Sequence, residues 1–313
     1  MIYSKILSIG SYLPNKIVTN NDLSKIINTN DEWIKKRTGI KFRRIAKEDY
    51  ETTTNMGFLA AQDAIKNAKV KLLKIDTIIV TTSSPDKIFP STACCIQKKL
   101  KIKDCVAFDI QAACSGFIYA INIADNLIKT GSSKKILIIG SEKMSKITDW
   151  KDRSSCILFG DGAGAIILES SKKPGILYIK LHSKTKHNNI LYLNAKKKSY
   201  IKMNGKIIFK MAVKYLKDIN LKTIKKTNIK INEIDWIIPH QANIRIINKV
   251  AKYINIPLKN IITTIEEYAN TSGASIPITM HHAIKIGKIK HNQLLLLEAF
   301  GAGLTYGIVL VKY

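Results

Sequence analysis

Long apolar runs, low-complexity tracts and paired cysteine motifs are all missing from this 313-residue sequence. No apolar run reaches the roughly 18 residues that a membrane-spanning helix needs, and residues 1–20 lack the basic-then-apolar order of a secretory signal. We therefore expect neither a membrane protein nor a secreted one. With 16 Gly and 7 Pro, the composition does not favour disorder either.

Metal-ligand spacings are missing too. The five cysteines include no Cys-x-x-Cys pair, and the six histidines do not stand at the spacings of a zinc site. No metal site is therefore expected. An odd number of cysteines in a long chain favours free thiols in a reducing compartment, so we expect a cytoplasmic location.

Arginine and acidic residues are scarce beside lysine. The 51 basic residues outnumber 23 acidic ones, giving a formal charge of +28, and 46 of the basic residues are Lys. Residues 1–172 carry +10 and residues 173–313 carry +18. Such a surface attracts nucleic acid, anionic membranes or acidic proteins, although arginine is the usual reader of phosphates and bases. Two interpretations stay open: drift of the composition toward Lys, Ile and Asn, and a basic patch that binds a partner.

Short β-rich apolar runs alternate with amphipathic stretches, which is typical of α/β proteins. Buried strands are expected at residues 76–80, 106–110, 135–139 and 234–238. Helical periodicity predicts helices at residues 55–69, 115–129, 209–226 and 243–254.

Two segments that close the two halves of the chain resemble each other. Residues 157–168 and 297–310 both have the pattern strand, glycine turn and strand, and both contain Phe-Gly-x-Gly. A divergent duplication explains this similarity, with an N-terminal half of residues 1–172 and a C-terminal half of residues 173–313. The reactive site of such a pair is expected between the halves, at the carboxyl ends of central strands.

Cys114 differs from the other cysteines in its predicted position. The strand at 106–110 leads through Gln111-Ala112-Ala113-Cys114-Ser115-Gly116 into a helix from about Phe117. Unpaired N–H groups and the helix dipole favour a thiolate there, so we expect a pKa below the usual value of about 8.5. The other four lie in helix or strand patterns and are expected to be buried structural residues: Cys94, Cys95, Cys105 and Cys156.

Two polar residues follow predicted strand positions in the C-terminal half. His240 ends a strand, matching the place of Cys114 in the first half, and Asn270 lies in a polar loop before a helix from about Ala274. Taken singly, they are an ordinary strand-end histidine and an ordinary helix-entry loop. Together with Cys114 they supply a nucleophile, an imidazole and a neutral amide donor.

Four motifs in order carry a resemblance to a known family. They are Ala113-Cys114-Ser115-Gly116, His240-Gln241-Ala242-Asn243-Ile244-Arg245, Asn270-Thr271-Ser272-Gly273-Ala274-Ser275 and Phe300-Gly301-Ala302-Gly303. With Asp31-Glu32-Trp33-Ile34 and Arg37-Thr38-Gly39-Ile40, the chain resembles β-ketoacyl-[acyl-carrier-protein] synthase III over nearly its whole length. The resemblance implies the thiolase fold, a duplicated five-layered αβαβα arrangement with two mixed sheets, usually in a homodimer. Asn270, where elongating relatives carry a second His, and a final glycine turn without Cys favour decarboxylative condensation over the thiolase reaction.

The resemblance also implies a two-stage reaction. Cys114 takes a short acyl group from CoA, and His240 and Asn270 then promote decarboxylation of malonyl-acyl carrier protein to give a 3-ketoacyl carrier protein. The backbone N–H groups of Cys114 and Ala302 would form the oxyanion hole, although the family usually has Gly at position 302. Acyl-CoA is a substrate, and no cofactor is expected.

Binding residues are implied in the same way. Those assigned to CoA are Trp33, Arg37, Thr38, Arg153, Phe209 and Asn243. Those assigned to the acidic carrier protein are Gln241, Ala242, Asn243, Ile244, Arg245 and Lys210. Phe89 would wall the acyl pocket of a partner subunit or, alternatively, serve in hydrophobic packing. Ser154 follows Arg153 where relatives often have Gly, which leaves the local loop geometry open.

The spacing of basic residues on two predicted helices places them on one face of each helix, where an acidic carrier protein is expected to bind. One predicted helix has Arg245, Lys249 and Lys252 on one face and an apolar face of Ile246, Val250 and Tyr253, and the other repeats the basic spacing with Lys210, Lys214 and Lys217.

Three other functions stay open. They are a polyketide-type condensing enzyme, a cysteine hydrolase with the same Cys-His-Asn set, and a nucleic-acid-binding protein, which rests on charge alone. We expect no nucleic-acid or membrane partner. Pocket walls come from several segments, so the sequence does not reveal whether the starter is acetyl, propionyl or branched.

Overall fold

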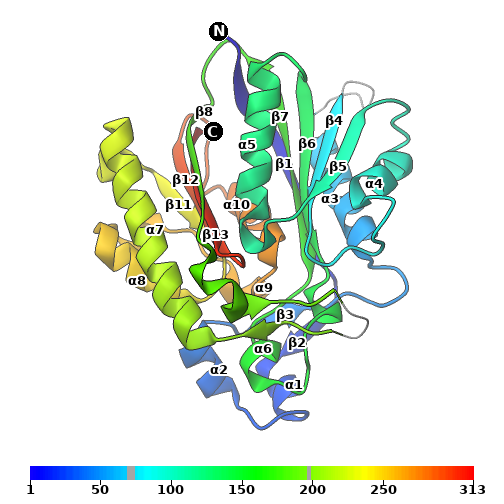
Figure 1. The fold of residues 1–313 in the computed structure, drawn as a ribbon, viewed down its shortest axis with the longest axis vertical. Coiled ribbons are helices and arrows are strands. Elements are labelled where there is room, and N and C mark those ends of the chain that lie inside the picture. The colour runs from blue at the N-terminus through cyan, green and yellow to red at the C-terminus, as the bar shows by residue number, and fades with distance from the viewer. Residues whose placement is uncertain (69–74, 196–198) are drawn as a thin grey trace.

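Two mixed β-sheets, one from each half of the chain, form the frame of the protein (Figure 1). The computed structural model describes residues 1–68, 75–195 and 199–313. From edge to edge, the first sheet contains β1 (Tyr3–Tyr12), β7 (Gly162–Ser171), β6 (Lys135–Glu142), β4 (Thr77–Thr81) and β5 (Val106–Ile110). The second contains β11 (Trp236–Pro239), β12 (Leu294–Gly301), β13 (Thr305–Lys312) and β8 (Ile176–Ser183).

Helices lie in three layers around these sheets. The outer layers are α3 (Thr53–Ala68) with α4 (Thr92–Leu100) on the first sheet, and α7 (Gly205–Thr227) with α8 (Ile244–Ile254) on the second. The central layer is α5 (Gly116–Lys129) and α10 (Ser275–Lys285), which pack between the sheets. The expected five-layered α/β arrangement with two mixed sheets is confirmed.

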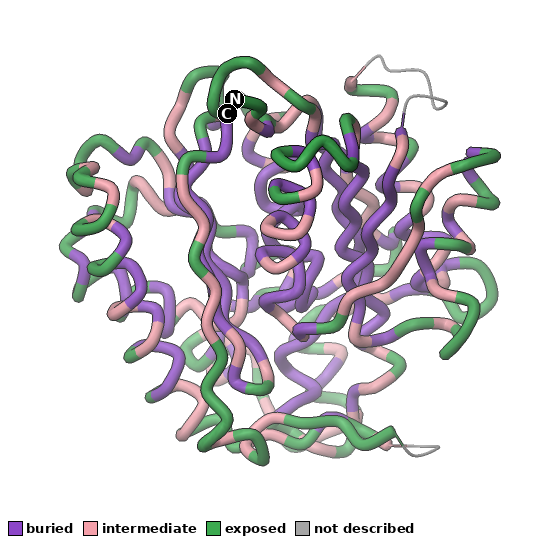
Figure 2. The backbone as a smooth tube through the Cα atoms, turned by 45° about the horizontal axis from the view of Figure 1, so that its top comes forward, coloured by how far each residue is buried: buried purple, intermediate pink, exposed green. Residues whose placement is uncertain are grey.

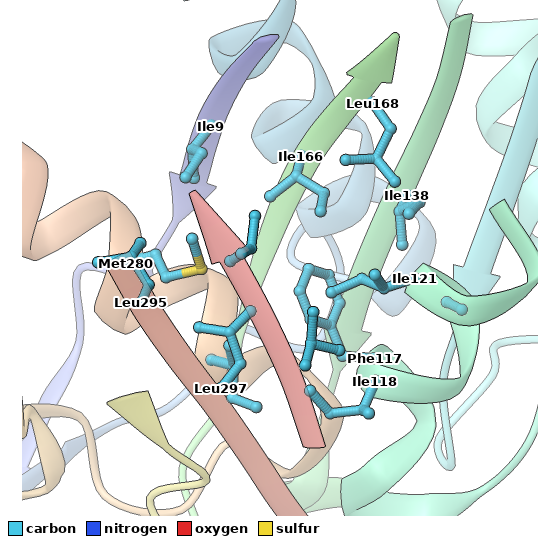
Figure 3. Packing of buried hydrophobic residues seen from close by; sticks show 14 of the residues in the cluster. Ile9, Phe117, Ile118, Ile121, Ile138, Ile166, Leu168, Met280, Leu295 and Leu297 are labelled. Atoms are coloured by element: carbon cyan, nitrogen blue, oxygen red, sulfur yellow. The ribbon is translucent and has the colours of Figure 1, made fainter. Parts of the chain in front are cut away.

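The largest hydrophobic cluster fills the space between the two sheets (Figure 3). Phe117 and Ile121 of α5 and Met280 of α10 lie against Ile138 of the first sheet and Leu297 of the second. Figure 2 shows the same distribution along the backbone, with buried positions running through the strands and central helices. Since each such side chain contributes about 1.5–3 kcal/mol when fully buried, the cluster joins the two halves into one folding unit.

The two sheets are built alike. Across each sheet, two parallel strands lie next to two antiparallel strands. The spatial order is β4, β6, β7 and β1 in the first sheet, and β11, β12, β13 and β8 in the second. In the first sheet β5 pairs in parallel with β4. At the equivalent edge of the second sheet, only an isolated parallel bridge between Ile237 of β11 and Ile261 is present among the described residues. The expected boundary after Lys172 falls in the turn between β7 and β8.

The two Phe-Gly-x-Gly motifs do not occupy equivalent places, so the strand–turn–strand prediction for residues 157–168 is wrong. Phe300–Gly303 forms the end of β12 and its turn into β13, whereas Phe159 follows α6 (Arg153–Cys156) and forms an isolated bridge with Asn270. The reason is an insertion, residues 143–161, between β6 and β7.

Smaller elements gather at the end of the sheets away from both chain termini (Figure 1). They are β2 (Ile17–Thr19), α1 (Asn20–Ser24), α2 (Asp31–Thr38), β3 (Phe42–Arg44), α6, β9 (Leu191–Tyr192), β10 (Lys202–Met203) and α9 (Ile265–Tyr268). No helix in the described ranges is long and apolar enough to cross a membrane.

Most predicted elements are present with shifted ends. The helix expected from Phe209 begins at Gly205, because the Asn204 side chain accepts the N–H of Ile207 at 3.2 Å and caps it there. Lys69, the predicted end of the helix from Asn55, lies outside the described residues.

The prediction that four cysteines are buried is wrong for three of them. Cys156 is buried, but Cys94 is exposed, and Cys95 and Cys105 are half-buried. These three lie in or beside α4 and β5, at the free edge of the first sheet, where fewer elements cover them.

Leu297→Ala should lower the free energy of unfolding by about 2–5 kcal/mol, because it leaves a cavity between the sheets where Leu297 is 0% exposed. Leu221→Ala on α7, where the leucine is 43% exposed, should change it by less than about 0.5 kcal/mol. Urea denaturation followed by far-UV circular dichroism measures both. Equal losses would contradict a shared core between the halves.

Candidate active site

The three residues predicted to be catalytic line one cavity of about 970 Å³, together with residues of both halves. Cys114 comes from the first half, and His240 and Asn270 come from the second. The same cavity reaches Trp33 and Arg37 on α2. The structure therefore brings the predicted catalytic residues together and connects them to the predicted CoA-binding residues.

Cys114 lies in a short 3-10 turn, Ala113–Ser115, between β5 and α5. Glycines allow two neighbours to approach it closely. A Cβ on Gly116 would lie 1.9 Å from Oγ1 of Thr81, and a Cβ on Gly301 would lie 2.9 Å from the backbone nitrogen of Cys114. The turn after β12 therefore packs directly on the backbone of the cysteine, where only glycine fits.

Burial controls the acidity of Cys114. It raises the pKa of the thiol to about 11, and the Ser272 hydroxyl, 3.5 Å from the sulfur, opposes this rise only in part. The predicted low pKa is therefore wrong. Loss of hydration destabilises the thiolate, and the nearby Glu142 carboxylate adds to this effect.

His240 follows β11 and is held by both its backbone and its ring. Its N–H donates to the carbonyl of Glu298 at 2.8 Å, and Nδ1 lies 2.7 Å from the hydroxyl of Ser275. The Ser275 oxygen also accepts the N–H of Gln241 at 3.4 Å, so its own proton is available to Nδ1. Burial lowers the pKa of His240 to about 3. The imidazole is therefore neutral at physiological pH, and this pattern leaves Nε2 as a donor.

Asn270 is clamped by the inserted segment of the other half. Its N–H donates to Leu158 at 2.9 Å, and its carbonyl accepts the N–H of Gly160 at 3.1 Å. The side-chain oxygen accepts the N–H of Ser272 at 2.8 Å. The amide Nδ2 therefore remains as the donor on the cavity side. The Phe-Gly segment of the first half thus positions a side chain of the second.

Ala302 lines the cavity in the turn after β12, beside Cys114. It is not among the residues with positive φ, whereas Gly303 has φ 125°. Alanine is therefore compatible with this backbone, and its N–H is retained. Ser154 is likewise free of positive φ, and its N–H donates to Asp152 at 2.9 Å to begin α6. The two departures from glycine distort neither turn.

Aromatic and basic side chains form the outer part of the cavity. The guanidinium carbons of Arg37 and Arg153 lie 5.4 and 4.7 Å from the centroid of Trp33, and that of Arg245 lies 5.3 Å from Phe209. Asn243 donates to the carbonyl of Arg37 at 3.0 Å. Guanidinium groups and stacked rings at a cavity mouth suit a nucleotide that carries phosphates.

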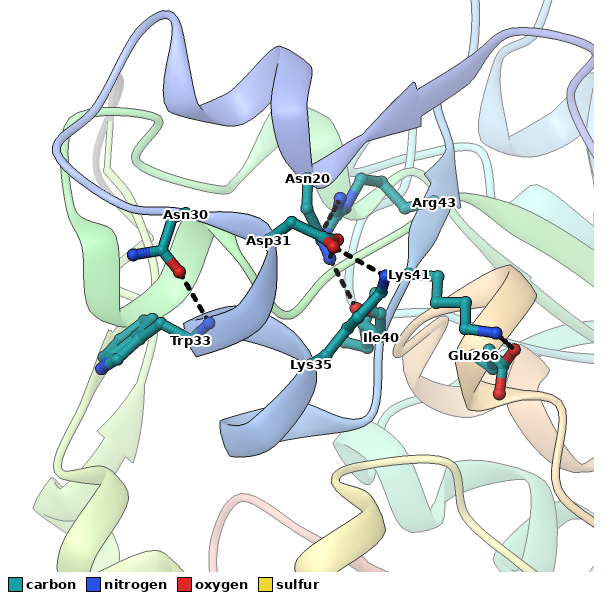
Figure 4. A network of polar contacts seen from close by, with 9 residues as sticks. All are labelled: Asn20, Asn30, Asp31, Trp33, Lys35, Ile40, Lys41, Arg43 and Glu266. Carbon is teal, nitrogen blue, oxygen red and sulfur yellow. Dashed lines mark hydrogen bonds and ion pairs between the residues drawn. The ribbon is translucent and has the colours of Figure 1, made fainter.

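The helix that carries Trp33 and Arg37 is fixed by polar contacts (Figure 4). The Asn30 side chain accepts the N–H of Trp33 at 2.8 Å and caps α2. Asn20 donates to Asp31 at 3.0 Å and accepts from the buried Arg43 at 2.9 Å. Arg43 also donates to the carbonyl of Ile157 at 2.9 Å. These bonds connect the cavity mouth with the segment that holds Asn270.

Two predictions near α8 are contradicted, one for a binding residue and one for a helix face. Gln241 is 1% exposed, and its side chain bonds to Pro239, Thr264 and Ile265, so its assignment to a carrier-protein surface is wrong. Of the predicted apolar face of α8, Ile246 and Val250 are buried, whereas Tyr253 is 48% exposed.

The remaining predicted binding residues divide between the cavity and the surface. Thr38 is buried and lines the cavity, Ala242 lines it half-buried, and Ile244 packs on Ile40. Lys210 is exposed on α7 outside the cavity lining. Phe89 is 84% exposed and lies outside the cavity of its own chain, so it does not pack within that chain.

Sequence reasoning missed four polar residues at the site. Ser272 and Ser275 stood within a recognised motif, and their hydroxyl groups next to Asn270 were an available signal. Glu142 is the last residue of β6, and Glu298 lies within β12, both in apolar strand patterns. Burial raises the pKa of each carboxyl group to about 7. No local sequence pattern marks them.

A half-buried thiol, a neutral imidazole and a carboxamide in the cavity of a five-layered αβαβα fold define a condensing enzyme, that is, an acyltransferase. Sequence models of 3-oxoacyl-[acyl-carrier-protein] synthase III match residues 108–185, and those of its C-terminal part match residues 224–313. The chain belongs to the 3-oxoacyl-[acyl-carrier-protein] synthase III family.

Individual relatives agree with this assignment. The β-ketoacyl-[acyl-carrier-protein] synthase III of Aquifex aeolicus is 49% identical over 311 residues, which are 99% of each chain. Its crystal structure matches with a TM-score of 0.96 over 99% of this chain and 100% of that one. The priming β-ketosynthase of the R1128 polyketide pathway is 30% identical, with a TM-score of 0.95 over 99% and 96% of the two chains.

Alkylation of Cys114 should follow its raised pKa. Because the thiol is neutral at pH 7, its rate with iodoacetamide should rise about tenfold per pH unit from pH 7 to 9, without a plateau. When the measurement is extended down to about pH 5.5, the rate should show no inflection near pH 6.5, because His240 is already neutral there. Mass spectrometry in a Cys94→Ser background, which removes the exposed thiol, measures the rate. A plateau below pH 8 would indicate a stable thiolate and contradict the burial argument.

Proposed function

We propose that this chain catalyses the first condensation of type II fatty-acid synthesis. A short acyl group, acetyl in the simplest case, passes from CoA to Cys114, and malonyl-acyl carrier protein is then decarboxylated and condensed to a 3-ketoacyl carrier protein. The observation that carries the proposal is the convergence of Cys114, His240 and Asn270 in one cavity of a chain that belongs to this family. Its free cysteines suit the reducing cytoplasm.

In the first stage the sulfur of Cys114 attacks the acyl-CoA carbonyl. The S–C bond to the enzyme forms, the bond to the CoA sulfur breaks, and the thiol proton balances the departing thiolate as free CoA. Because the resting thiol is neutral, the sulfur need not carry a charge between turnovers. Covalent capture divides the condensation into two easier steps.

In the second stage two neutral donors act on the malonyl thioester. Nε2–H of His240 and Nδ2–H of Asn270 donate to its carbonyl oxygen as carbon dioxide leaves and negative charge builds there. The resulting carbanion attacks the acyl carbonyl on Cys114, so the new carbon–carbon bond and a tetrahedral oxyanion form. The C–S bond then breaks, and the departing thiolate takes up a proton from solvent to restore the neutral thiol. The N–H groups of Cys114 and Ala302 stabilise the oxyanion, and one such donor accounts for about 10²–10³ in rate.

Basic residues beside the cavity support docking of an acidic carrier protein. Arg245 and Lys206 line the mouth, and Lys217 of α7 and Lys249 of α8 lie 5.3 and 5.1 Å from the ring of Tyr253. The exposed ring therefore joins the basic faces of the two helices into one surface. A positive surface raises the association rate with an acidic partner in a salt-dependent way.

A homodimer is part of the proposal. β5 is the free edge of the first sheet, with Val106 59% exposed, and Ile88 and Phe89 project nearby without cover. An unpaired edge strand beside exposed apolar side chains favours association with a second copy. Phe89 would then reach the acyl pocket of the partner.

A polyketide-priming reaction is the second candidate. It is favoured by the similarity to the R1128 priming β-ketosynthase, which shares the fold at 30% identity. Both reactions use an acyl-cysteine and differ in the acyl group and carrier. Incubation with mixed acyl-CoAs, followed by mass spectrometry of the acylated enzyme, separates them by the chain length found on Cys114.

Labelling with radioactive acetyl-CoA tests the catalytic assignments. Cys114→Ser should abolish labelling, because a serine hydroxyl is a far weaker nucleophile than a thiol, whereas the matched Cys94→Ser variant should keep it. His240→Ala and Asn270→Ala should retain labelling but lower malonyl decarboxylation about 10²–10³-fold. Normal condensation by Asn270→Ala would contradict its role. Free acetate as the main product would indicate a hydrolase.

Charge reversal on α7 tests carrier docking. Lys210→Glu should raise the KM for malonyl-acyl carrier protein about tenfold at 50 mM salt and leave the KM for acetyl-CoA unchanged, because Lys210 is exposed outside the cavity lining. Lys225→Glu, at the far end of the same helix, is the control and should have little effect. Steady-state kinetics at low and high salt measures both. Equal effects of the two variants would mean that net charge, rather than a docking face, matters.

A further inference from the structure

Beneath the catalytic cysteine lies a carboxyl group that the proposed reaction does not use. Glu142 ends β6 and is 0% exposed. Its oxygens accept the N–H of Ser83 at 3.0 and 3.1 Å and the hydroxyl of Ser84 at 2.7 Å. Among the described residues, all of its hydrogen-bond partners are neutral. A buried carboxyl group without a cation is costly, so its retention calls for a reason.

The carboxyl group contacts the loop that carries Ser272. A Cβ built on Gly273 would lie 3.5 Å from Oε1 of Glu142 and 3.6 Å from the carbonyl oxygen of Ala113. Gly273 thus separates Glu142 from the residue that precedes Cys114. The Ser272 hydroxyl and the Gly273 N–H also stabilise the Glu142 anion, although burial still raises its pKa to about 7.

Two residues at this contact have backbones that their side chains disfavour. Ala113 has φ 46° and Ser272 has φ 48°, a left-handed conformation that costs about 1–3 kcal/mol for a residue other than glycine. They precede Cys114 and Gly273, in the 3-10 turns that lead into α5 and α10. Strained turns keep their shape only where the surroundings fix them, and Glu142 contacts the second of them directly.

We propose that Glu142 is a positioning residue for the condensation, acting through the end of β4 and the Ser272–Gly273 turn. On one side it holds Ser83, which lines the cavity. On the other it supports the turn whose Ser272 N–H orients the amide of Asn270 at 2.8 Å. The carboxyl group thus fixes the amide that stabilises the malonyl enolate. This inference rests on the proposed function.

Glu142→Gln separates positioning from simple stability. Glutamine keeps the shape but has only one acceptor oxygen. With that oxygen at the position of Oε2, where it still accepts from Ser83 and Ser84, its NH₂ group replaces Oε1 beside Gly273 and can no longer accept from the Ser272–Gly273 turn. Decarboxylation and condensation, counted per acetyl-labelled Cys114, should fall about 10–100-fold, the effect of misplacing a catalytic group by about 1 Å. The KM for acetyl-CoA should change less than twofold, because α2 and α8 are untouched. Glu142→Asp should recover part of the rate.

Asp125→Asn is the matched control. Asp125 is also a buried carboxylate, but it lies near the far end of α5, where it accepts from Ser4 at 2.5 Å and pairs with Lys129 at 2.7 Å. This variant should lower the melting temperature and keep the rate per labelled site. Ser84→Ala, which removes one donor to Glu142, gives a smaller loss and serves if Glu142→Gln does not fold.

The outcomes are distinct. If the wild-type enzyme releases no carbon dioxide from malonyl-acyl carrier protein, the proposed function fails, whatever the variants do. If the wild type is active and Glu142→Gln (or Ser84→Ala in its place) keeps its rate per labelled site within twofold, the positioning role is overturned. Equal losses in Glu142→Gln and Asp125→Asn overturn it as well, because they reduce the effect to stability.

Discussion

The close packing of two helix entries, one from each half of the chain, is the constraint on which the site depends. The turns before α5 and α10 meet between the sheets, and the sulfur of Cys114 lies 3.5 Å from the hydroxyl of Ser272. A third segment, the turn after β12, reaches the backbone of Cys114 because Gly301 has no side chain. The hydrophobic cluster around α5 and α10 holds these turns in register. A shift of either sheet would separate the thiol from its partners.

Burial at this contact determines the chemistry. It raises the pKa of Cys114 to about 11 and lowers that of His240 to about 3, so both groups rest in their neutral forms. An imidazolium–thiolate pair is therefore not the resting state. A neutral His240 and a neutral Asn270 are suited to stabilising charge that develops during the reaction, since fixed donors in a site of low polarity need no reorganisation. Glu142, which accepts hydrogen bonds from Ser83 and Ser84, lies behind the turn that carries Ser272.

The charge of the chain has a partial explanation. Arg37, Arg153 and Arg245, three of the five arginines, lie at the cavity mouth against aromatic rings, and Arg43 is buried behind it. Lysines of α7 and α8 extend the positive surface outward from there. The arginines are thus concentrated where planar donors can meet phosphate. In the described ranges, other lysines, such as Lys5, Lys129 and Lys135, form ion pairs outside the cavity lining.

The sequence by itself determined the elements and the reacting groups, because both depend on local signals. Apolar runs marked the strands, and the turn before a helix distinguished Cys114 from the other cysteines. His240 and Asn270 were identified from the family motifs in which they stand, together with Cys114. The pKa values and the burial of side chains depend on packing between distant segments, so only the tertiary structure decided them. Burial reversed the expected acidity of Cys114, placed Gln241 inside, and put Glu142 beneath the site. The electrostatic environment of a side chain depends on every segment that packs around it, and most of these segments are distant in the sequence.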